Sequence, residues 1–237
     1  MWPRLAAFLL LAAGLRGCVA YEYEHEFWLK VDGSGSVYVT GRPELWRAFK
    51  GLQVEGQDAG YMRAAARALF ERSGLRVRRV TVTRRRGRSY LFVSADFDDV
   101  NALPGKPAFP DLAIGLRPQR EGLRLEGRWS RPSGLGQGPP VDSAGLMAVR
   151  FHLPSKVHGH DNADLGVERG NIITWRQGVA QALGGRPVAF GATLDPRSIL
   201  WSTVGLFAAA IALGLGILAV ALLLVFRRGR KEVRSQP

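Results

Sequence analysis

The chain has 237 residues, of which 46% are hydrophobic and 22% charged, a composition that excludes global disorder. Its length allows one moderate domain or two small ones besides targeting segments, and its single cysteine excludes an intrachain disulfide framework and a cysteine-based zinc site. Of the formal net charge of +13, +2 lies up to residue 18 and +4 after residue 226, so +7 remains for the middle. The middle is therefore basic but carries charges of both signs. Either an arginine-rich coding bias or an anionic partner explains its excess of positive charge.

The first twenty residues have the pattern of a signal peptide. Arg4 supplies a short positive region, and residues 5–15 form an apolar run that is too short to cross a bilayer. We therefore expect residues 1–20 to direct export of the chain.

Cys18, the only cysteine, directly follows this apolar run, which disfavours a buried core thiol. Residues 15–18 resemble a lipobox and make Cys18 a lipidation candidate, although Arg16 stands where a small or apolar residue is usual. Residues 18–20 also fit the small-x-small cleavage site of an ordinary signal peptide. Lipidation, ordinary cleavage and an uncleaved anchor all stay open.

The next segment begins with a predicted β-hairpin. Residues 21–31 alternate between apolar or aromatic side chains on one face and Glu22, Glu24 and Glu26 on the other, as in a half-buried strand. A turn rich in glycine and serine then leads into a second strand at residues 37–40.

An amphipathic helix is predicted at residues 59–74, where Gly74 provides a natural stop. Residues 75–83 and 89–97 have the alternation of two further strands. Region 21–103 is therefore expected to fold as β-β-α-β-β, an α+β layer in which the helix covers one face of a sheet.

Region 104–198 is predicted to be rich in β-structure, after a linker or long loop at residues 104–110. Strands are predicted at residues 112–118, 122–130, 146–154, 171–176 and 186–194. A stretch rich in glycine and proline at residues 131–140 predicts an extended connection. The sequence leaves open whether the two regions share one sheet or form two subdomains.

Residues 199–226 form an apolar run without a charge, longer than the ~20 residues that a spanning helix needs. Trp201 lies near its outer end, and the basic stretch 227–231 follows at once, as the positive-inside rule expects on the cytoplasmic side. The two membrane signals predict a single-pass membrane protein with residues 21–198 outside the cytoplasm and 227–237 as a basic cytoplasmic tail.

Three small residues of this helix, Ala208, Ala212 and Gly216, recur at every fourth position. They share one helix face and permit close approach of a second helix, which makes them a candidate packing site for a membrane-protein partner. Ordinary filler in a helix rich in alanine, glycine and leucine is the simpler explanation.

A loose pattern in the second half matches a known family. Its residues are Leu153, Pro154, Asn162, Gly166, Gly170, Asn171 and Trp175. With the lipobox-like cysteine, the strand–hairpin–helix–hairpin segment and the C-terminal apolar helix, the chain resembles the LppM-type lipoprotein domain, a bacterial envelope family without an established enzymatic activity. The resemblance covers most of the chain and implies a membrane-tethered extracytoplasmic α+β domain that binds lipids or envelope components. It supplies no catalytic residue.

The cluster His158, His160 and Asp161 is the best candidate for metal chemistry. Two imidazoles and a carboxylate this close are suitable ligands for a divalent metal, with His152 as a further ligand. The surrounding stretch is rich in glycine, asparagine and aspartate, however, which is typical of a solvated loop. No neighbouring acidic group is clearly placed as a general base. We expect no cofactor and no enzymatic activity.

The predicted hairpin tip at residues 84–88 crowds Arg84, Arg85, Arg86 and Arg88 into one turn. An anionic lipid headgroup or envelope polymer would relieve their mutual repulsion, and the planar guanidinium suits phosphate. Nucleic acid is not expected as a partner because the tip lies outside the cytoplasm. A solvated turn is the simpler explanation.

Four tryptophans, Trp28, Trp46, Trp129 and Trp175, fall in predicted strands or helices and are core candidates. The same side chains would line a lipid cavity if the core were hollow.

These observations predict an α+β domain anchored in the cell membrane. Its expected function is that of a non-enzymatic envelope module that binds a lipid, a polymer or a protein partner. The alternatives are a metal-assisted envelope hydrolase that uses His158 and His160, and a structural subunit of a membrane complex.

Overall fold

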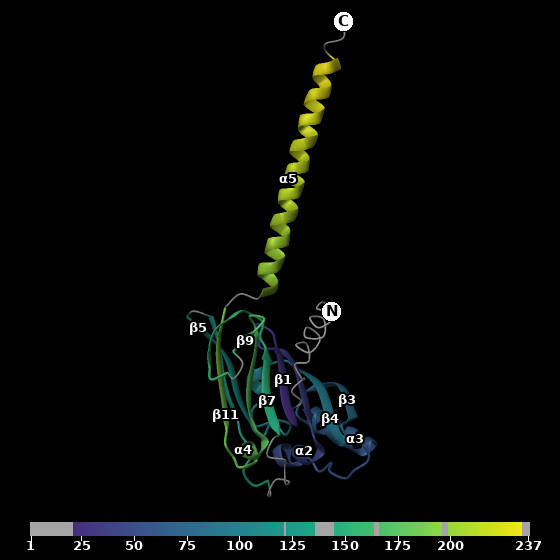
Figure 1. Ribbon diagram of the computed structural model, residues 1–237, viewed down its shortest axis with the longest axis vertical. Helices are drawn as coiled ribbons and strands as arrows, with labels where there is room; N and C mark the ends of the chain where they lie inside the picture. The colour runs from purple at the N-terminus through teal and green to yellow at the C-terminus, as the bar shows by residue number, and fades with distance from the viewer. Residues whose placement is uncertain (1–20, 121, 136–144, 164–165, 196–198, 234–237) are drawn as a thin grey trace, which may run out of the picture.

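The computed structural model describes residues 21–120, 122–135, 145–163, 166–195 and 199–233. They form two β-sheets with short helices packed on them and one long C-terminal helix that extends away from the domain (Figure 1). The predicted α+β class is confirmed.

The described residues form eleven strands, four α-helices and one 3₁₀ turn. The strands are β1 (Tyr23–Leu29), β2 (Gly35–Gly41), β3 (Arg76–Arg85), β4 (Arg88–Phe97), β5 (Leu112–Gln119), β6 (Gly122–Trp129), β7 (Leu146–His152), β8 (Val157–Asp161), β9 (Val167–Glu168), β10 (Ile172–Gly178) and β11 (Val188–Leu194). The helices are α2 (Pro43–Lys50), α3 (Ala59–Arg72), the 3₁₀ turn η1 (Val100–Ala102), α4 (Val179–Leu183) and α5 (Ile199–Val233). The sequence did not predict β8, β9 and α4, which are all short.

The two predicted regions share one sheet. Seven strands lie in the order β3-β4-β2-β1-β7-β10-β9, and β1 pairs with β7 in parallel while every other pair is antiparallel. The other sheet has the order β5-β6-β11-β8 and is antiparallel throughout. The β1–β7 pair therefore joins the region before residue 103 to the region after it.

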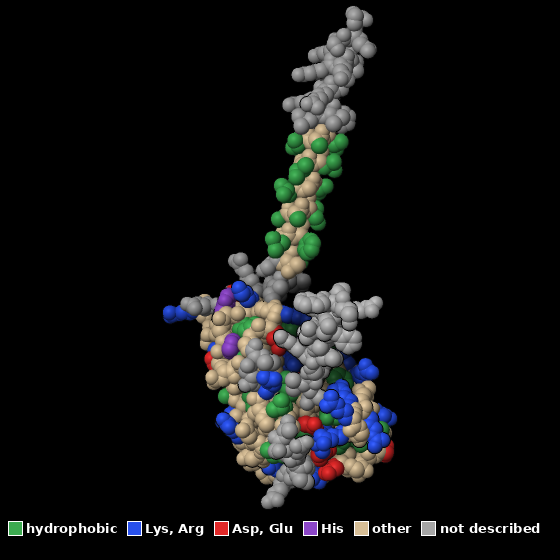
Figure 2. Space-filling model, in the orientation of Figure 1, with side chains coloured by type: hydrophobic (Ala, Val, Ile, Leu, Met, Phe, Trp, Pro, Cys, Tyr) green, Lys and Arg blue, Asp and Glu red, His purple; other side chains and the backbone are tan. Residues whose placement is uncertain are grey.

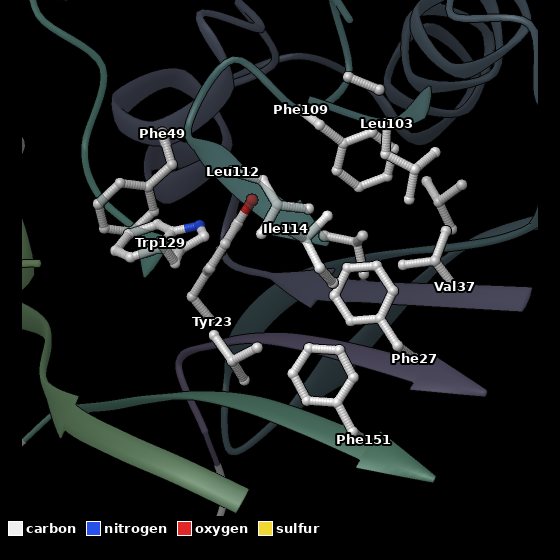
Figure 3. Close-up of a cluster of buried hydrophobic side chains, with 14 of the residues drawn as sticks. Tyr23, Phe27, Val37, Phe49, Leu103, Phe109, Leu112, Ile114, Trp129 and Phe151 are labelled. Carbon is white, nitrogen blue, oxygen red and sulfur yellow. The ribbon is translucent and has the colours of Figure 1, made fainter. Parts of the chain in front are cut away.

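The core lies where the two sheets and helices α2 and α3 meet. Alternate residues of β1 point into it, and the rings of Phe27 and Phe151 stack there with centroids 5.1 Å apart (Figure 3). Trp129 of β6 packs edge-on against Phe49 of α2, with centroids 4.7 Å apart. The predicted loop at 104–110 also contributes to the core, because Phe109 is fully buried.

The core prediction was right for three of the four tryptophans and wrong for Trp28. Trp46, Trp129 and Trp175 are buried, whereas Trp28 is 44% exposed. The reason is the two-residue period of β1, which turns Trp28 to the same face as Glu24 and Glu26 and away from the core.

Helix α3 begins and ends as its sequence predicts. The side chain of Asp58 accepts hydrogen bonds from the backbone N–H groups of Gly60 and Tyr61 and caps the first turn. The helix ends at Arg72, just before Gly74, which adopts the left-handed φ of +76° that stops it.

Helix α5 contains a stretch, Thr203–Leu223, of 21 residues with a mean hydropathy of 2.7, none of it buried against the domain. By length and composition this stretch is able to cross a membrane.

The domain has two distinct ends. Asp195, the last described residue before α5, donates its backbone N–H to the carbonyl of Lys156, and Val157 donates to the carbonyl of Gly170. This end, where β1 and β7 finish, is the α5-proximal end. Helices α2 and α4 lie at the other, distal end (Figure 1).

A buried ion pair lies inside the core. Lys50 and Asp111 have fully buried side chains with Nζ and Oδ1 3.5 Å apart, and the indole N–H of Trp129 donates to Asp111 Oδ2 at 2.8 Å. Lys50 also donates to the carbonyl of Ala108 at 2.5 Å. Burial lowers the pKa of Lys50 and raises that of Asp111, and each partner opposes the effect on the other.

Lys50→Met should destabilise the domain by about 3 kcal/mol, because it leaves the buried carboxylate of Asp111 without its cation. The double variant Lys50→Met with Asp111→Asn should recover much of this loss, since the amide oxygen still accepts from Trp129. Chemical denaturation of the full chain in detergent measures both changes. The control is Arg47→Met, which breaks an exposed pair with Glu55 and should cost under about 1 kcal/mol; equal costs at the two sites would contradict this account.

His25 is a second buried titratable group. Its side chain lies fully inside the core, its Nδ1 has no hydrogen-bond partner in the described part of the chain, and its Nε2 lies 3.5 Å from the Tyr23 hydroxyl. Burial, and then the nearby charge of Lys50, lower the pKa of His25 well below its ordinary value. The imidazole is therefore neutral in the folded protein.

The domain should lose stability as the pH falls below about 6.5, because His25 then takes up a proton only in the unfolded chain. The expected slope is about 1.4 kcal/mol per pH unit, until the folded pKa is reached. Denaturation midpoints measured from pH 7.5 to 5 test this. His25→Phe should flatten the profile; parallel profiles for wild type and His25→Phe would contradict the assignment.

Candidate anion-binding site

The predicted arginine hairpin is present at the distal end of the seven-stranded sheet. Arg85 pairs with Arg88 at the ends of β3 and β4, and the two residues between them, Arg86 and Gly87, have φ values of 50° and 77°. Two consecutive positive φ angles are the signature of a tight two-residue hairpin turn. The turn holds four arginines within five positions of the chain.

Arg88 is anchored by Glu22, which precedes β1. The Glu22 carboxylate accepts hydrogen bonds from Arg88 Nη1, Arg42 Nη1 and the Tyr90 hydroxyl, each at 3.3 Å. Arg42, just before α2, also pairs with Glu44. Burial and then the charge of Glu22 raise the pKa of Tyr90, which keeps its hydroxyl protonated as a donor.

The other three arginines of the turn project from it without a described ion pair, although burial raises the pKa of Glu24 and the charge of Arg85 partly offsets this rise. Arg84 Nε donates to the carbonyl of Gly87 at 3.3 Å, and the Arg85 guanidinium lies 5.6 Å from the centroid of the Tyr90 ring. Arg84, Arg85 and Arg86 are all exposed, and none forms an ion pair with a described acidic side chain.

At the opposite end of β3, two arginines have acidic partners. There Arg76 pairs with Asp98 at 3.0 Å and Arg78 pairs with Asp96 at 2.6 Å. Lys and Arg side chains gather over β3, β4 and α3, with acidic side chains among them (Figure 2). Three exposed arginines without a described ion pair are therefore adjacent in the chain at the turn.

A pocket of ≈ 340 Å³ lies beside the hairpin. Its polar lining comes from Arg42, Glu44, Glu55, Gln57, Arg88 and Ser89. Its two cations are matched by two carboxylates, so the pocket itself has no excess of either sign. Glu22, Arg42 and Tyr90 were not identified from the sequence, although the alternation of residues 21–31 had already placed Glu22 on the outer face.

The structure does not bring the metal candidates together. His158 and His160 share one face of β8, and the two-residue period turns Asp161 to the other face. His158 Nε2 lies 2.6 Å from Asp195 Oδ1, His160 Nδ1 accepts from the backbone of Ala163, and Asp161 pairs with Arg124. Among the described residues no group of three His, Cys, Asp or Glu side chains is arranged to hold a metal ion.

The other histidine proposed as a ligand belongs to a different site. His152 lies in the seven-stranded sheet, 2.7 Å from Glu26 Oε1, and stacks on Trp28 with ring centroids 3.6 Å apart and planes 7° apart. It is therefore held by β1, whereas His158 and His160 belong to the four-stranded sheet.

The other candidates are three small residues of α5 and Cys18. Ala208, Ala212 and Gly216 lie on the exposed, unpartnered surface of α5. Cys18 lies outside the described residues.

No protein-family model matches the chain, and no curated protein matches it. Among solved structures, the chain is similar to the NMR structure of the folded domain of the LppM protein of Mycobacterium tuberculosis. The two are 11% identical, the match covers 78% of this chain and 98% of that chain, and the TM-score is 0.42. At this identity the likeness concerns the fold alone.

Glu22→Gln should destabilise the domain by about 1–2 kcal/mol, because it removes the charge that holds Arg42 and Arg88. The matched control is Glu126→Gln, since Glu126 is exposed and makes no ion pair with a described residue. Denaturation of the full chain in detergent compares them. If both variants were as stable as the wild type, Glu22 would not be the anchor of the hairpin.

Proposed function

We propose that this protein is a membrane-anchored extracytoplasmic module that binds an anionic polymer of the cell envelope through its arginine hairpin. In this proposal α5 spans the membrane once, the tail after residue 226 is cytoplasmic, and the domain performs no catalysis. Membership of the LppM-type lipoprotein domain family is part of the proposal and rests on the sequence pattern from Leu153 to Trp175.

The observation on which the proposal depends is a set of three exposed arginines on a tight turn, none of which forms an ion pair with a described acidic side chain. The turn fixes the backbone from which Arg84, Arg85 and Arg86 project, and the contacts of Arg88 with Glu22 fix the base of the hairpin. Guanidinium groups projecting from a fixed backbone suit phosphate or carboxylate groups spaced along a polymer, because less backbone freedom is lost on binding.

The position of the hairpin favours a polymer over the headgroups of the membrane that would hold α5. The strand residues from Arg86 to Phe97, at about 3.3 Å each, span roughly 36 Å. Phe97 pairs with Gly35 at the α5-proximal end, so the turn lies far from where α5 leaves the domain. Electrostatic attraction is screened over about 10 Å at 0.1 M salt, which is much less than this separation.

Metal-assisted hydrolysis has less support. His158 is engaged by Asp195 and would have to give up this contact to bind a metal with His160.

Replacement of Arg84, Arg85 and Arg86 by serine should weaken binding of a polyglycerol phosphate chain by about 10- to 100-fold, at about 0.5–1 kcal/mol per arginine. Titration of the full chain in detergent, in low and in 0.15 M salt, measures this change. Added salt should weaken wild-type binding and have less effect on the triple variant.

The control replaces Arg63, Arg72 and Arg128, which are exposed and form no ion pair with a described acidic side chain, so the net charge changes equally. This control should lose much less affinity. Equal losses in the two triple variants would show that net charge, and not the hairpin, determines binding. Wild-type binding no tighter than that of neutral dextran would refute the proposed function.

A further inference from the structure

The described domain exposes few large apolar side chains. Outside α5 they are Trp28 at 44%, Val31 at 39% and Tyr61 at 49%. Trp28 is the penultimate residue of β1, and Val31 follows in the turn to β2, so both lie at the α5-proximal end. Tyr61 lies in the first turn of α3, away from both.

Trp28 is held rigidly. One face of its indole stacks on His152 at 3.6 Å, and His152 is itself fixed by Glu26. The indole N–H has no hydrogen-bond acceptor in the described part of the chain. A fixed, half-exposed indole with a free donor is suited to the interface between water and lipid, where tryptophan is enriched.

Exposed cations lie at the same end of the domain as these two residues. Lys30 precedes Val31, Lys156 lies between β7 and β8, Arg169 lies between β9 and β10, and Arg120 lies at the β5–β6 turn. None forms an ion pair with a described acidic side chain. Trp28, Lys30, Val31, Arg120, Lys156 and Arg169 together are called the proximal surface.

Acidic side chains also lie at this end, and two of them pair with basic side chains of the protein: Asp98 with Arg76, and Asp195 with His158. Asp32 accepts hydrogen bonds from Ser34, which lower the pKa of its carboxyl, and it is an exposed carboxylate near Lys30, whose charge helps to lower that pKa. The proximal surface presents apolar side chains and exposed cations together.

The chain itself keeps this surface near α5. Three residues separate Asp195 from the start of α5, and a chain of this length covers at most about 14 Å. A membrane that contains α5 therefore lies within reach of the turns that carry Lys30, Lys156 and Arg169.

We infer that the proximal surface docks on the headgroups of the bilayer that holds α5. Trp28 and Val31 lie at headgroup depth, and the four cations bind lipid phosphates. The inference rests on the proposed function in one respect, that α5 spans the membrane. It goes further by assigning the orientation of the domain and the residues in contact with lipid.

The test places one environment-sensitive fluorophore at a time in the full chain, reconstituted in phosphatidylglycerol nanodiscs. Cys18→Ser removes the native thiol, and the labelled variants are Val31→Cys, Leu215→Cys and Arg86→Cys. Leu215 reports on the middle of α5, and Arg86 is the control at the distal hairpin. Brominated lipids then quench any fluorophore that reaches the bilayer.

The expected result is quenching and a blue shift at positions 31 and 215, and neither at position 86. Quenching at 215 without quenching at 31 would overturn the docking inference and leave the membrane anchor intact. No quenching at 215 would refute the anchor and the inference with it. Equal quenching at 31 and 86 would overturn the assigned orientation.

A second measurement tests the role of the cations. Replacing Lys30, Lys156 and Arg169 by serine should reduce the quenching of the fluorophore at position 31. Phosphatidylcholine in place of phosphatidylglycerol should reduce it similarly, since the attraction is to net negative lipid. Unchanged quenching in both cases would show that the cations do not bind the headgroups.

Discussion

The parallel pairing of β1 with β7 determines how the rest of this protein is arranged. Residues Tyr23 to Trp28 pair in register with Met147 to His152, two segments more than a hundred residues apart in the chain. Because the strands are parallel, both finish at the end from which α5 leaves. The turn before β2 and the connection from β7 to β8 therefore meet near α5, while the start of β1 and its neighbour Arg88 lie at the distal end.

This polarity gives the domain two surfaces with different chemistry. The distal hairpin carries three exposed arginines that form no ion pair with a described acidic side chain, and the proximal surface combines Trp28 and Val31 with exposed cations.

The sequence was most informative where a signal is local. The alternation of residues 21–31 predicted β1 and its inner face, and the apolar stripe before Gly74 predicted α3. The parallel pairing has no local signal, because it depends on packing between distant segments. Trp28 was assigned to the core from its residue type, whereas the strand period turns it outward. The arginine turn was predicted, but its anchor Glu22 was not, since Glu22 lies 66 residues away from Arg88.

In this fold the arginine hairpin and α5 lie at opposite ends of the domain. A distance between spin labels at Arg86→Cys and Val204→Cys, in the full chain with Cys18→Ser, measures this separation. The fold predicts a separation longer than about 35 Å, from the length of β4 and the hairpin. A separation below about 20 Å would place both at the same end and contradict the account.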